Sequence, residues 1–245
     1  ERRSLQPLTQ RYPDLTLETA YQISLRFLQR REALGEQVIG KKIGVTSRAV
    51  QDMLDVHQPD FGFLTNRMQV ADNSDVSFSA NLLVQPRAEG EIAFILGEDL
   101  HGPGITAEDV MAASQWVVPC FEIVDSRIAD WKIRIQDTVA DNASCGVFAL
   151  GEQRIDPRDL DVAKVELHLL KNGQPAGNGF GSAVQGHPCA AVAWLANTLG
   201  KFDIPFRKGE IILSGALAPL VPVLPGDEVS LTLSGLGSAR LRFVS

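Results

Sequence analysis

Two glutamates separated by one glycine, Glu89 and Glu91, stand at the start of the apolar run of residues 92–96. In an extended chain successive side chains alternate between faces, so both carboxylates point to the same side. Two like charges this close repel each other unless a cation or solvent relieves them. A third acidic residue, Glu122, lies in the apolar run of residues 116–124, where an ionised carboxylate is costly unless it is paired or binds a metal.

These three glutamates together offer hard oxygen ligands without any histidine or cysteine. Such a set suits Mg²⁺ or Mn²⁺ better than Zn²⁺ and leaves coordination positions for water and a chelating substrate. The alternative is that Glu89 and Glu91 are solvated at a strand end and that Glu122 forms a salt bridge with Arg127. Because an E-x-E pair is weakly specific, the residues alone leave both interpretations open.

Two adjacent lysines, Lys41 and Lys42, lie between glycines in the segment GKKIG. Neighbouring residues of a strand face opposite sides, so only one lysine can share a pocket with the carboxylates. There it would neutralise a substrate carboxylate or a developing enolate. The alternative is a pair of lysines on a surface strand.

Two polar segments supply further candidates. Asp60, in an expected loop over residues 56–62, could act as a general base or close an Asx turn. Residues 137–146, DTVADNASCG, concentrate Asp, Asn and Ser in an expected loop that ends with Ser144 near a strand. Such a loop either satisfies its own backbone or lines a site.

Hydrophobic periodicity predicts more strands than helices, and the two do not alternate regularly. The helices are expected at residues 16–35, 47–55, 106–115 and 187–200. The strands are expected at residues 37–47, 89–96, 116–124, 146–150, 163–173, 209–215, 227–237 and 239–244. This order favours an α+β architecture with a mixed, largely antiparallel β-roll core over a doubly wound parallel sheet. We expect one domain, in which residues 1–70 form an N-terminal helical elaboration packed on a catalytic core of residues 71–245.

The composition excludes several classes of function. A net charge of −7 over 245 residues, with no clear basic run, argues against nucleic-acid binding. No apolar stretch approaches the roughly 20 residues of a membrane helix. Three widely spaced cysteines indicate reduced thiols in a cytoplasmic protein. There is no G-x-S-x-G, P-loop or G-x-G-x-x-G signature. Because the first residue is not Met, we expect that a leading segment precedes it.

Five segments, taken in order, resemble the 2-hydroxypenta-2,4-dienoate hydratases of bacterial meta-cleavage pathways, in the hydratase/decarboxylase branch of the fumarylacetoacetate hydrolase superfamily. These segments are residues 40–64, 87–96, 121–144, 186–200 and 209–229. The resemblance implies a β-roll fold and a metal-dependent hydratase that acts on a 2-hydroxydienoate. It also implies a homo-oligomer, which in some settings forms a complex with the decarboxylase of the pathway.

The same resemblance assigns roles to individual residues. It implies that Glu89, Glu91 and Glu122 hold Mg²⁺ or Mn²⁺, that Lys42 is the lysine of the G-x-K-x-G strand, and that the active-site acid and serine are Asp60 and Ser144. The sister 4-oxalocrotonate decarboxylases share the glutamates and the lysine, and a non-catalytic 2-oxo-acid-binding partner is a further alternative. The C–C bond hydrolases of the superfamily use a Glu–His pair on a lid, for which this sequence offers no convincing histidine.

Overall fold

The computed structural model describes residues 3–47, 51–52 and 56–245. The helix expected over residues 47–55 therefore lies largely outside the described residues. None of the described helices is both long and apolar enough to cross a membrane.

The helices and strands of the described chain have the following bounds. The helices are α1 (Leu8–Arg11), α2 (Leu17–Ala33), α4 (Ala107–Ala113), α5 (Ile135–Ala140) and α6 (Pro188–Gly200), with 3₁₀ turns η1 (Ala129–Trp131), η2 (Pro157–Asp159) and η3 (Gly181–Ala183). The strands are β1 (Val38–Gly44), β2 (Asp60–Thr65), β3 (Gln69–Val70), β4 (Ser74–Ser77), β5 (Pro86–Leu96), β6 (Ser114–Asp125), β7 (Cys145–Leu150), β8 (Glu166–Lys171), β9 (Gln174–Phe180), β10 (Ile211–Ala216), β11 (Val221–Pro222), β12 (Glu228–Leu233) and β13 (Gly237–Val244).

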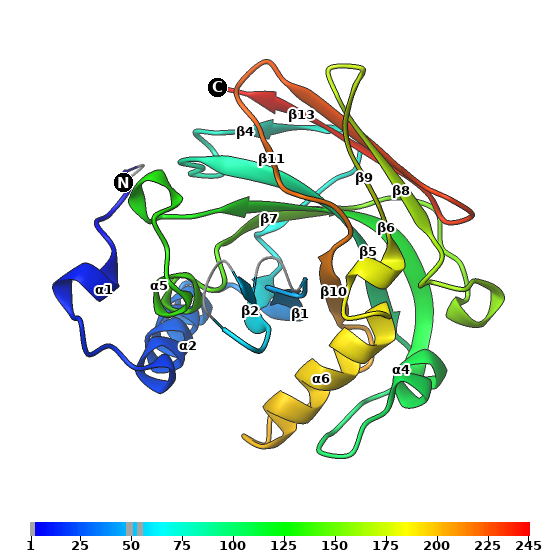
Figure 1. The fold of residues 1–245 in the computed structure, drawn as a ribbon, viewed down its shortest axis with the longest axis horizontal. Helices are drawn as coiled ribbons and strands as arrows, with labels where there is room; N and C mark the ends of the chain where they lie inside the picture. Colours follow the sequence, from blue (N-terminus) through cyan, green and yellow to red (C-terminus); the bar gives the residue numbers. More distant parts are fainter. Residues whose placement is uncertain (1–2, 48–50, 53–55) are drawn as a thin grey trace.

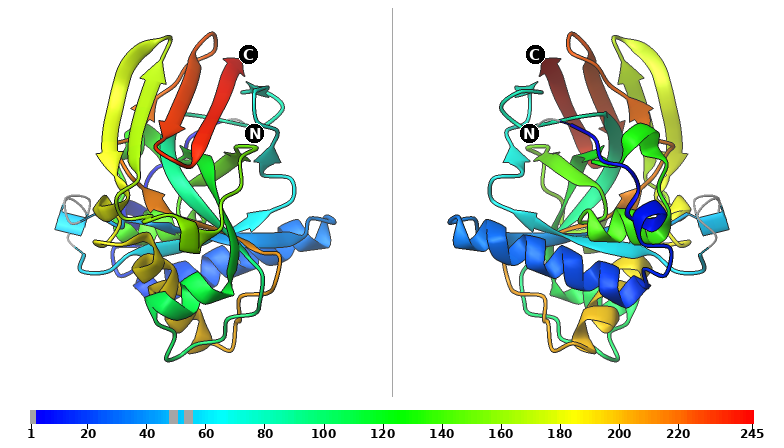
Figure 2. Two further views of the ribbon diagram at one scale, coloured as in Figure 1. Left: turned by 90° about the vertical axis from the view of Figure 1, so that its right-hand side faces the viewer. Right: turned by 90° about the vertical axis from the view of Figure 1, so that its left-hand side faces the viewer.

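Two mixed sheets form the framework. The larger sheet has the order β2-β1-β10-β5-β6-β7-β3, with β11 paired to β5, and it curls into a half-barrel (Figure 1). The smaller sheet has the order β4-β13-β12-β8-β9, and its strands stand together in the two side views of Figure 2. Most pairs are antiparallel, while β1–β10, β3–β7 and β4–β13 are parallel. The expected mixed, largely antiparallel sheet is confirmed.

Helices cover the larger sheet at two places. Near β10, α6 packs beside α4, and on the other side of the molecule α2 packs against α5 (Figure 1). The helix expected from Thr16 forms as α2, since the Thr16 hydroxyl accepts a hydrogen bond from the Thr19 amide at 3.2 Å. It ends before Gly35, whose φ of +86° is a conformation that glycine adopts at little cost.

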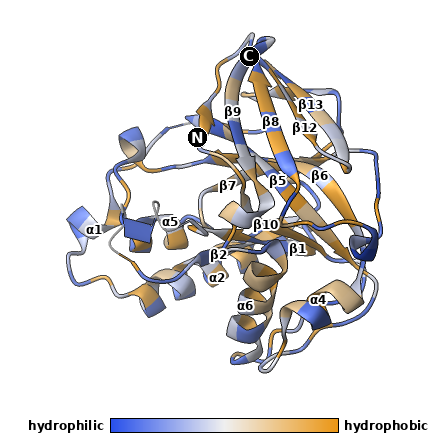
Figure 3. Cartoon of the chain, turned by 45° about the vertical axis from the view of Figure 1, so that its right-hand side comes forward, coloured by the Kyte–Doolittle hydropathy of each residue, from blue (hydrophilic) through white to orange (hydrophobic). Residues whose placement is uncertain are grey.

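The longest strand pair, β5 with β6, forms the middle of the larger sheet and is predominantly hydrophobic (Figure 3). One face of β5 carries Ile92 and Phe94, which are fully buried between the sheets and α6. The opposite face carries Glu89 and Glu91, as strand alternation predicts. In the antiparallel register Glu89 lies directly opposite Glu122 of β6, so the strand pairing brings the third glutamate to the first two.

Two sequence-based expectations about loops are wrong. Asp60 does not lie in a loop, because β2 begins there and pairs with the Gly44 end of β1. Residues 137–140 belong to α5, whose first turn is capped by Asp137: its carboxylate accepts hydrogen bonds from the amide of Arg134 and from the amide and hydroxyl of Thr9. Composition alone suggested turns here, and these long-range contacts outweigh that local tendency.

Candidate metal and substrate site

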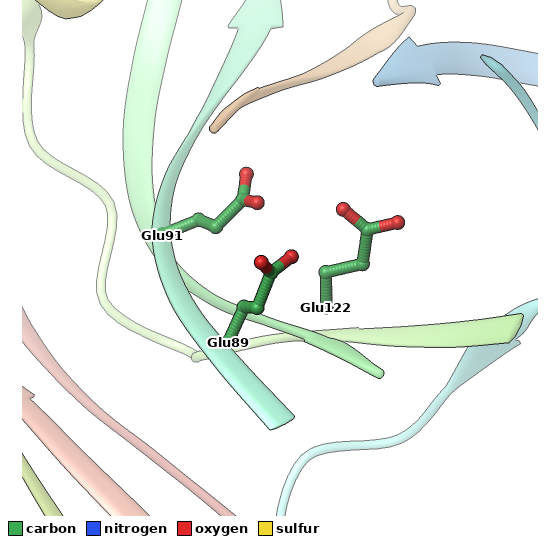
Figure 4. Close-up of side chains that lie close together, drawn as sticks. All are labelled: Glu89, Glu91 and Glu122. Carbon is green, nitrogen blue, oxygen red and sulfur yellow. The ribbon is translucent and has the colours of Figure 1, made fainter. Parts of the chain in front are cut away.

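Three carboxylates converge on one point of the half-barrel (Figure 4). One carboxylate oxygen each from Glu89, Glu91 and Glu122 lies within 4.8 Å of the other two. Glu91 and Glu122 are almost completely buried, with exposed fractions of 1% and 0%, and Glu89 is partly buried. Because β5 and β6 are rigid central strands, their pairing fixes the spacing of the three groups.

Several oxygens of this cluster have no hydrogen-bond partner among the described residues. The amide of Gly215 donates to Oε2 of Glu91 at 2.9 Å, and Oε1 of Glu91 accepts nothing. Neither oxygen of Glu122 accepts a hydrogen bond of normal geometry. Buried carboxylate oxygens without donors are costly. Their position therefore fits a hard divalent cation, for which three carboxylates are suitable ligands.

Burial and mutual repulsion both raise the pKa values of the clustered carboxyls. Burial, followed by the charge of Glu122, raises the pKa of Glu89 to about 8. Burial and the charges of Glu122 and Glu89 raise the pKa of Glu91 well above its ordinary value, although the Gly215 amide opposes this. A bound cation would reverse these shifts by favouring the ionised carboxylates.

Lys42 is the lysine that reaches the carboxylates. Its Nζ lies 3.1 Å from Oε1 of Glu122, and its side chain is only 3% exposed. Burial disfavours the charged ammonium, but the nearby charges of Glu122 and Asp60 outweigh this and raise the pKa of Lys42. Lys41 points to the opposite face and pairs with Glu210. The expectation that only one of the two lysines shares the pocket is confirmed.

Asp60 approaches the same space from β2 and is 2% exposed. Neither of its carboxylate oxygens accepts a hydrogen bond of normal geometry from a described residue, so the Asx-turn alternative is wrong. Burial raises its pKa, Lys42 opposes the shift and Glu122 adds to it. The Asp60 carboxyl is thus a buried group whose pKa lies above its ordinary value.

The segment after α5 forms an unusual turn at the cavity wall. Asn142, Ala143 and Ser144 have φ values of 56°, 51° and 54°, which L-residues adopt at a cost. The side chain of Asn142 holds the turn, because it accepts from the Phe63 amide at 2.9 Å and donates to the Phe63 carbonyl at 3.0 Å. The turn presents the Ser144 hydroxyl 3.1 Å from that of Thr138.

Arg127 holds the other side of this turn. Its guanidinium donates to the carboxylate and the carbonyl of Asp141 at 2.7 and 2.6 Å, and to the carbonyls of Asp125 and Cys145 at 2.7 and 2.9 Å. The alternative in which Glu122 forms its salt bridge with Arg127 is therefore wrong. Arg127 pairs with Asp141, while Glu122 pairs with Lys42.

A cavity of about 690 Å³ contains these groups. Its walls include Lys42, Asp60, Glu89 and Ser144, so four of the six residues singled out in the sequence line one space. The other two, Glu91 and Glu122, lie behind Glu89 in the same carboxylate cluster.

Backbone strain concentrates at the same walls. Val45, Asp130, Trp131, Ala143 and Ser144 all line the cavity with φ between 51° and 58°. Such strain persists where the surrounding structure over-determines it, which is common at functional sites.

The sequence analysis missed Arg87 and Trp131, which also line the cavity, and it did not single out Thr138 within the candidate segment 137–146. Arg87 had a usable signal, because it continues the alternation of Glu89 and Glu91 on the same face of β5. The signal for Thr138 was only that of its polar segment, because its own position depends on the short helix α5, and Trp131 had none, since its position depends on a strained 3₁₀ turn.

The three cysteines are buried and form no disulfide, as their spacing predicts. Burial raises the pKa values of Cys120 and Cys145 well above the usual range, with further contributions from Glu91 and Glu122 respectively. At neutral pH both are therefore neutral thiols that line the apolar backing of the glutamates.

Known proteins resemble this chain over nearly its whole length. The family described as "Fumarylacetoacetate (FAA) hydrolase C-terminal" matches residues 26–244. A 2-hydroxyhexa-2,4-dienoate hydratase of Comamonas testosteroni is 65% identical over 98% of this chain and 91% of its own length. A 2-hydroxypent-2,4-dienoate hydratase of Pseudomonas putida is 59% identical over 83% of this chain and 91% of its own.

Among solved structures, 4-oxalocrotonate decarboxylase from Pseudomonas putida G7, complexed with magnesium and adipate, superposes with a TM-score of 0.95. It is 35% identical over 99% of this chain and 91% of its own. The same enzyme complexed with calcium and acetate gives a TM-score of 0.93, with the same identity and coverage.

Proposed function

This chain belongs to the fumarylacetoacetate hydrolase family, and on that premise we propose that it hydrates 2-hydroxypenta-2,4-dienoate to 4-hydroxy-2-oxopentanoate in the meta-cleavage catabolism of aromatic compounds. Relatives that are 46% to 65% identical are named as hydratases, which makes this protein a hydro-lyase. The observation that carries the proposal is the buried triad of Glu89, Glu91 and Glu122 with Lys42 paired to it.

We propose that the triad holds Mg²⁺ or Mn²⁺. The three carboxylates and their unpartnered oxygens fit a hard divalent cation, and the decarboxylase neighbour is complexed with magnesium or calcium. When bound, such a cation supplies Lewis acidity toward the carboxylate and 2-oxygen of the substrate and orients both.

Three side chains near the metal site would stabilise developing charge, transfer protons and position the substrate. Lys42 is a buried, fully charged ammonium, so it stabilises negative charge that develops on the 2-oxygen. Asp60 carries a raised pKa in the same cavity, which suits a group that gives and takes a proton. Ser144, bonded to Thr138, positions the substrate carboxylate or the attacking water.

The reaction can be written with balanced atoms. The 2-hydroxydienoate first takes a proton at C5 and releases the proton of its 2-hydroxyl, which gives the 2-oxo-3-enoate. Water then adds its oxygen to C4, and a proton is delivered to C3, so that one water is incorporated overall. Negative charge collects on the 2-oxygen during the addition, beside Lys42.

The experiment that tests this function is loss of diene absorbance with purified protein and Mg²⁺. Glu122→Gln removes one ligand with little change in side-chain volume, so turnover should be abolished while the far-UV circular dichroism stays the same. The matched control is Glu228→Gln on β12, a partly buried glutamate paired with Arg240 away from the cavity, which should retain activity. Full activity of Glu122→Gln in the presence of a chelator would show that the metal mechanism is wrong.

One observation favours a second candidate, decarboxylation of a 4-oxalocrotonate-type dicarboxylate. The solved structure with a TM-score of 0.95 is such a decarboxylase. The same preparation should therefore be given the dicarboxylate while CO₂ is monitored. Hydration of the monocarboxylate without CO₂ release from the dicarboxylate supports the hydratase, and the reverse supports the decarboxylase.

Assembly and organisation follow as part of the same proposal. We infer a cytoplasmic homo-oligomer in which residues 1–70 are an elaboration on the catalytic core of residues 71–245, able to associate with the decarboxylase of the pathway. Light scattering coupled to size-exclusion chromatography tests the oligomer directly, and a single protomer mass at micromolar concentration would contradict it.

A further inference from the structure

The chain ahead of α2 lies against one wall of the cavity, although the mechanism above gives it no part. Residues 4–11, which we call the N-terminal strap, include α1 and precede the residues 26–244 that match the fumarylacetoacetate hydrolase family. The strap runs along the segment between β6 and α5 and then along α5 itself (Figure 1). That segment, α5 and the turn after it carry Trp131, Thr138 and Ser144, which line the cavity.

The first contact of the strap is with the segment after β6. The amide of Leu5 donates to the Arg127 carbonyl at 2.7 Å, and the amide of Ala129 donates to the Leu5 carbonyl at 2.8 Å. Leu5 thereby forms a parallel β-bridge with Ile128. Because the Leu5 residue is 47% exposed, this contact rests mainly on backbone hydrogen bonds. It ties the strap to the chain that leads into Trp131.

The second contact of the strap is with the first turn of α5. The amide and the hydroxyl of Thr9 donate to the two carboxylate oxygens of Asp137 at 3.1 and 2.8 Å. The same carboxylate accepts a hydrogen bond from the Arg134 amide at 2.9 Å. Asp137 is 0% exposed, and hydrogen bonds to a carboxylate are stronger than those between neutral groups. Thr9 therefore supplies two of the three hydrogen bonds that hold this buried side chain.

Asp137 and Thr138 are neighbours on α5, but their side chains meet different parts of the molecule. Successive residues of an α-helix point about 100° apart, so Asp137 meets the strap while Thr138 lines the cavity. The helix has only six residues, which is too short to be stable by itself. Its position and its rotation about its own axis are therefore set by the groups that hold it, and the strap is one of them.

Ser144 depends on the same helix. The turn that follows α5 has positive φ values, and its Ser144 hydroxyl lies 3.1 Å from the hydroxyl of Thr138. Asn142 holds this turn to β2 from one side, and the strap holds α5 from the other. A small rotation of α5 would move the Thr138 hydroxyl and break its contact with Ser144. Displacements of about 1 Å are enough to slow an enzymatic reaction strongly.

We propose that Thr9 is a positioning residue of the active site: through Asp137 and α5 it holds the Thr138–Ser144 hydroxyl pair in place at the cavity wall. The N-terminal strap is thus part of the active-site architecture, although none of residues 4–11 lines the cavity. The effect on turnover rests on the function proposed above, in which Ser144 positions the substrate carboxylate or the attacking water.

The test is steady-state hydration by the Mg²⁺-loaded protein with Thr9→Val. Valine keeps the shape of threonine and the amide donor but removes the hydroxyl, so kcat/KM should fall about 10-fold. Thr9→Ser retains the hydroxyl and should keep most of the activity. The matched control is Thr106→Val, which removes a hydroxyl that donates to the Asp109 carboxylate at 2.9 Å in the first turn of α4. Since α4 does not line the cavity, its kcat/KM should be unchanged.

A double variant separates positioning from a general loss of stability. If Thr9 acts through Ser144, Thr9→Val combined with Ser144→Ala should be little slower than Ser144→Ala alone. Three results would overturn the proposal: an unchanged kcat/KM in Thr9→Val, an equal loss in Thr106→Val, or losses that multiply in the double variant. Thr9→Ala removes the same hydroxyl without a branched side chain, and it takes the place of Thr9→Val if the valine variant does not fold.

Failure of the proposed function can be told apart from failure of the strap. Turnover of the dienoate by the natural protein tests the function alone. Hydrogen–deuterium exchange tests the strap without turnover, because the amides of Asp141, Ser144 and Cys145 are all hydrogen-bonded in the turn after α5. In a protein without turnover, faster exchange of these amides in Thr9→Val but not in Thr106→Val would contradict the hydratase and support the strap. Unchanged exchange in such a protein would overturn both.

Discussion

Two adjacent residues of β1, Lys41 and Lys42, are equally buried at 2% exposure, yet their surroundings differ in kind. Lys41 pairs with Glu210 and lies 5.0 Å from the centroid of the Phe206 ring. Glu210 also accepts a hydrogen bond from the Arg207 amide at 3.0 Å. The ammonium of Lys42 instead lies near several carboxylates, those of the glutamate cluster and that of Asp60 on β2.

The balance of charge separates the two environments. Around Lys41, one ammonium meets one carboxylate and an aromatic face, so no additional ion is required to balance the charge. Burial lowers the pKa of Lys41, and Glu210 only partly offsets this. Around Lys42, four carboxylates meet one ammonium, which leaves an excess of negative charge that a cation must offset. A matched buried pair therefore indicates a structural role, and an unmatched one indicates a site for a ligand.

The largest predicted effect is on turnover by Lys42→Met. This change removes the only ammonium that pairs with Glu122 within the described residues, so kcat should fall by about 10³. Diene absorbance at saturating Mg²⁺ gives the rate. Thermal unfolding should show that the variant is still folded, because the cation continues to neutralise the glutamates.

The matched control for that prediction is Lys41→Met, measured well below its unfolding temperature. Since Lys41 faces away from the cavity, kcat should stay within a few-fold of the natural value. Equal losses of kcat in the two variants would contradict the division between a structural and a functional lysine.

The second prediction reverses the comparison and concerns stability. Lys41→Met leaves the carboxylate of Glu210 without its ammonium, which should lower the free energy of unfolding by about 3 kcal/mol. Urea titration of the metal-loaded protein measures it. Adding Glu210→Gln removes the stranded charge and should restore most of the loss. A double variant no more stable than Lys41→Met would show that the ion pair is not the cause.

The third prediction concerns pH and the metal-free protein. The pKa of Glu89 is about 8 in the folded state and near 4.5 when unfolded, so between these values the folded state binds more protons. Its contribution to stability is fully present below about pH 4.5 and is lost as pH rises through about 8. The free energy of unfolding should therefore fall by about 3 kcal/mol from pH 5 to 8.

Saturating Mg²⁺ should abolish this decline, because the bound cation favours the ionised carboxylates at every pH above their unfolded values. Glu89→Gln should flatten the decline without any metal, which separates it from other titrating groups. If the free energy of unfolding falls equally with pH in the metal-free natural protein and in metal-free Glu89→Gln, the titration of Glu89 is not the cause of the decline.

The local sequence explains why part of this site was predictable. Alternation along β5 placed Glu89 and Glu91 on one face, and alternation along β1 separated Lys41 from Lys42, because both follow from strand geometry alone. The meeting of Glu89 with Glu122 depends on the register of β5 with β6, which periodicity does not specify. Only the resemblance to a family predicts that the two residues share a site.

The parts that were predicted wrongly depend on long-range contacts. The segment 137–146 as a whole is rich in Asp, Asn and Ser, which favours a loop, but Asp137 caps α5 and binds Thr9, which is 128 positions away. Pro59, which has no amide donor, favours a loop at Asp60, yet pairing with β1 makes Asp60 the first residue of a strand. β9 was missed because QPAGNGF has few strand-forming residues, and its pairing with β8 decides its conformation.

The smallest predicted effect extends the comparison from charges to hydroxyls. Ser214 is buried and donates to the Ile92 carbonyl at 2.8 Å, so its hydrogen bond is satisfied inside the sheet. The Ser144 hydroxyl forms a hydrogen bond with the Thr138 hydroxyl and also lines the cavity. Ser144→Ala should lower kcat/KM about 10-fold and change Tm little, because the hydroxyl acts on the ligand and the turn is held by its neighbours. Ser214→Ala should lower the free energy of unfolding by about 1 kcal/mol and leave kcat/KM unchanged. If Ser144→Ala lost stability and kept kcat/KM, the Ser144 hydroxyl would have a structural role like that of Ser214. Catalysis would then depend on the charged groups of the cavity and not on this hydroxyl.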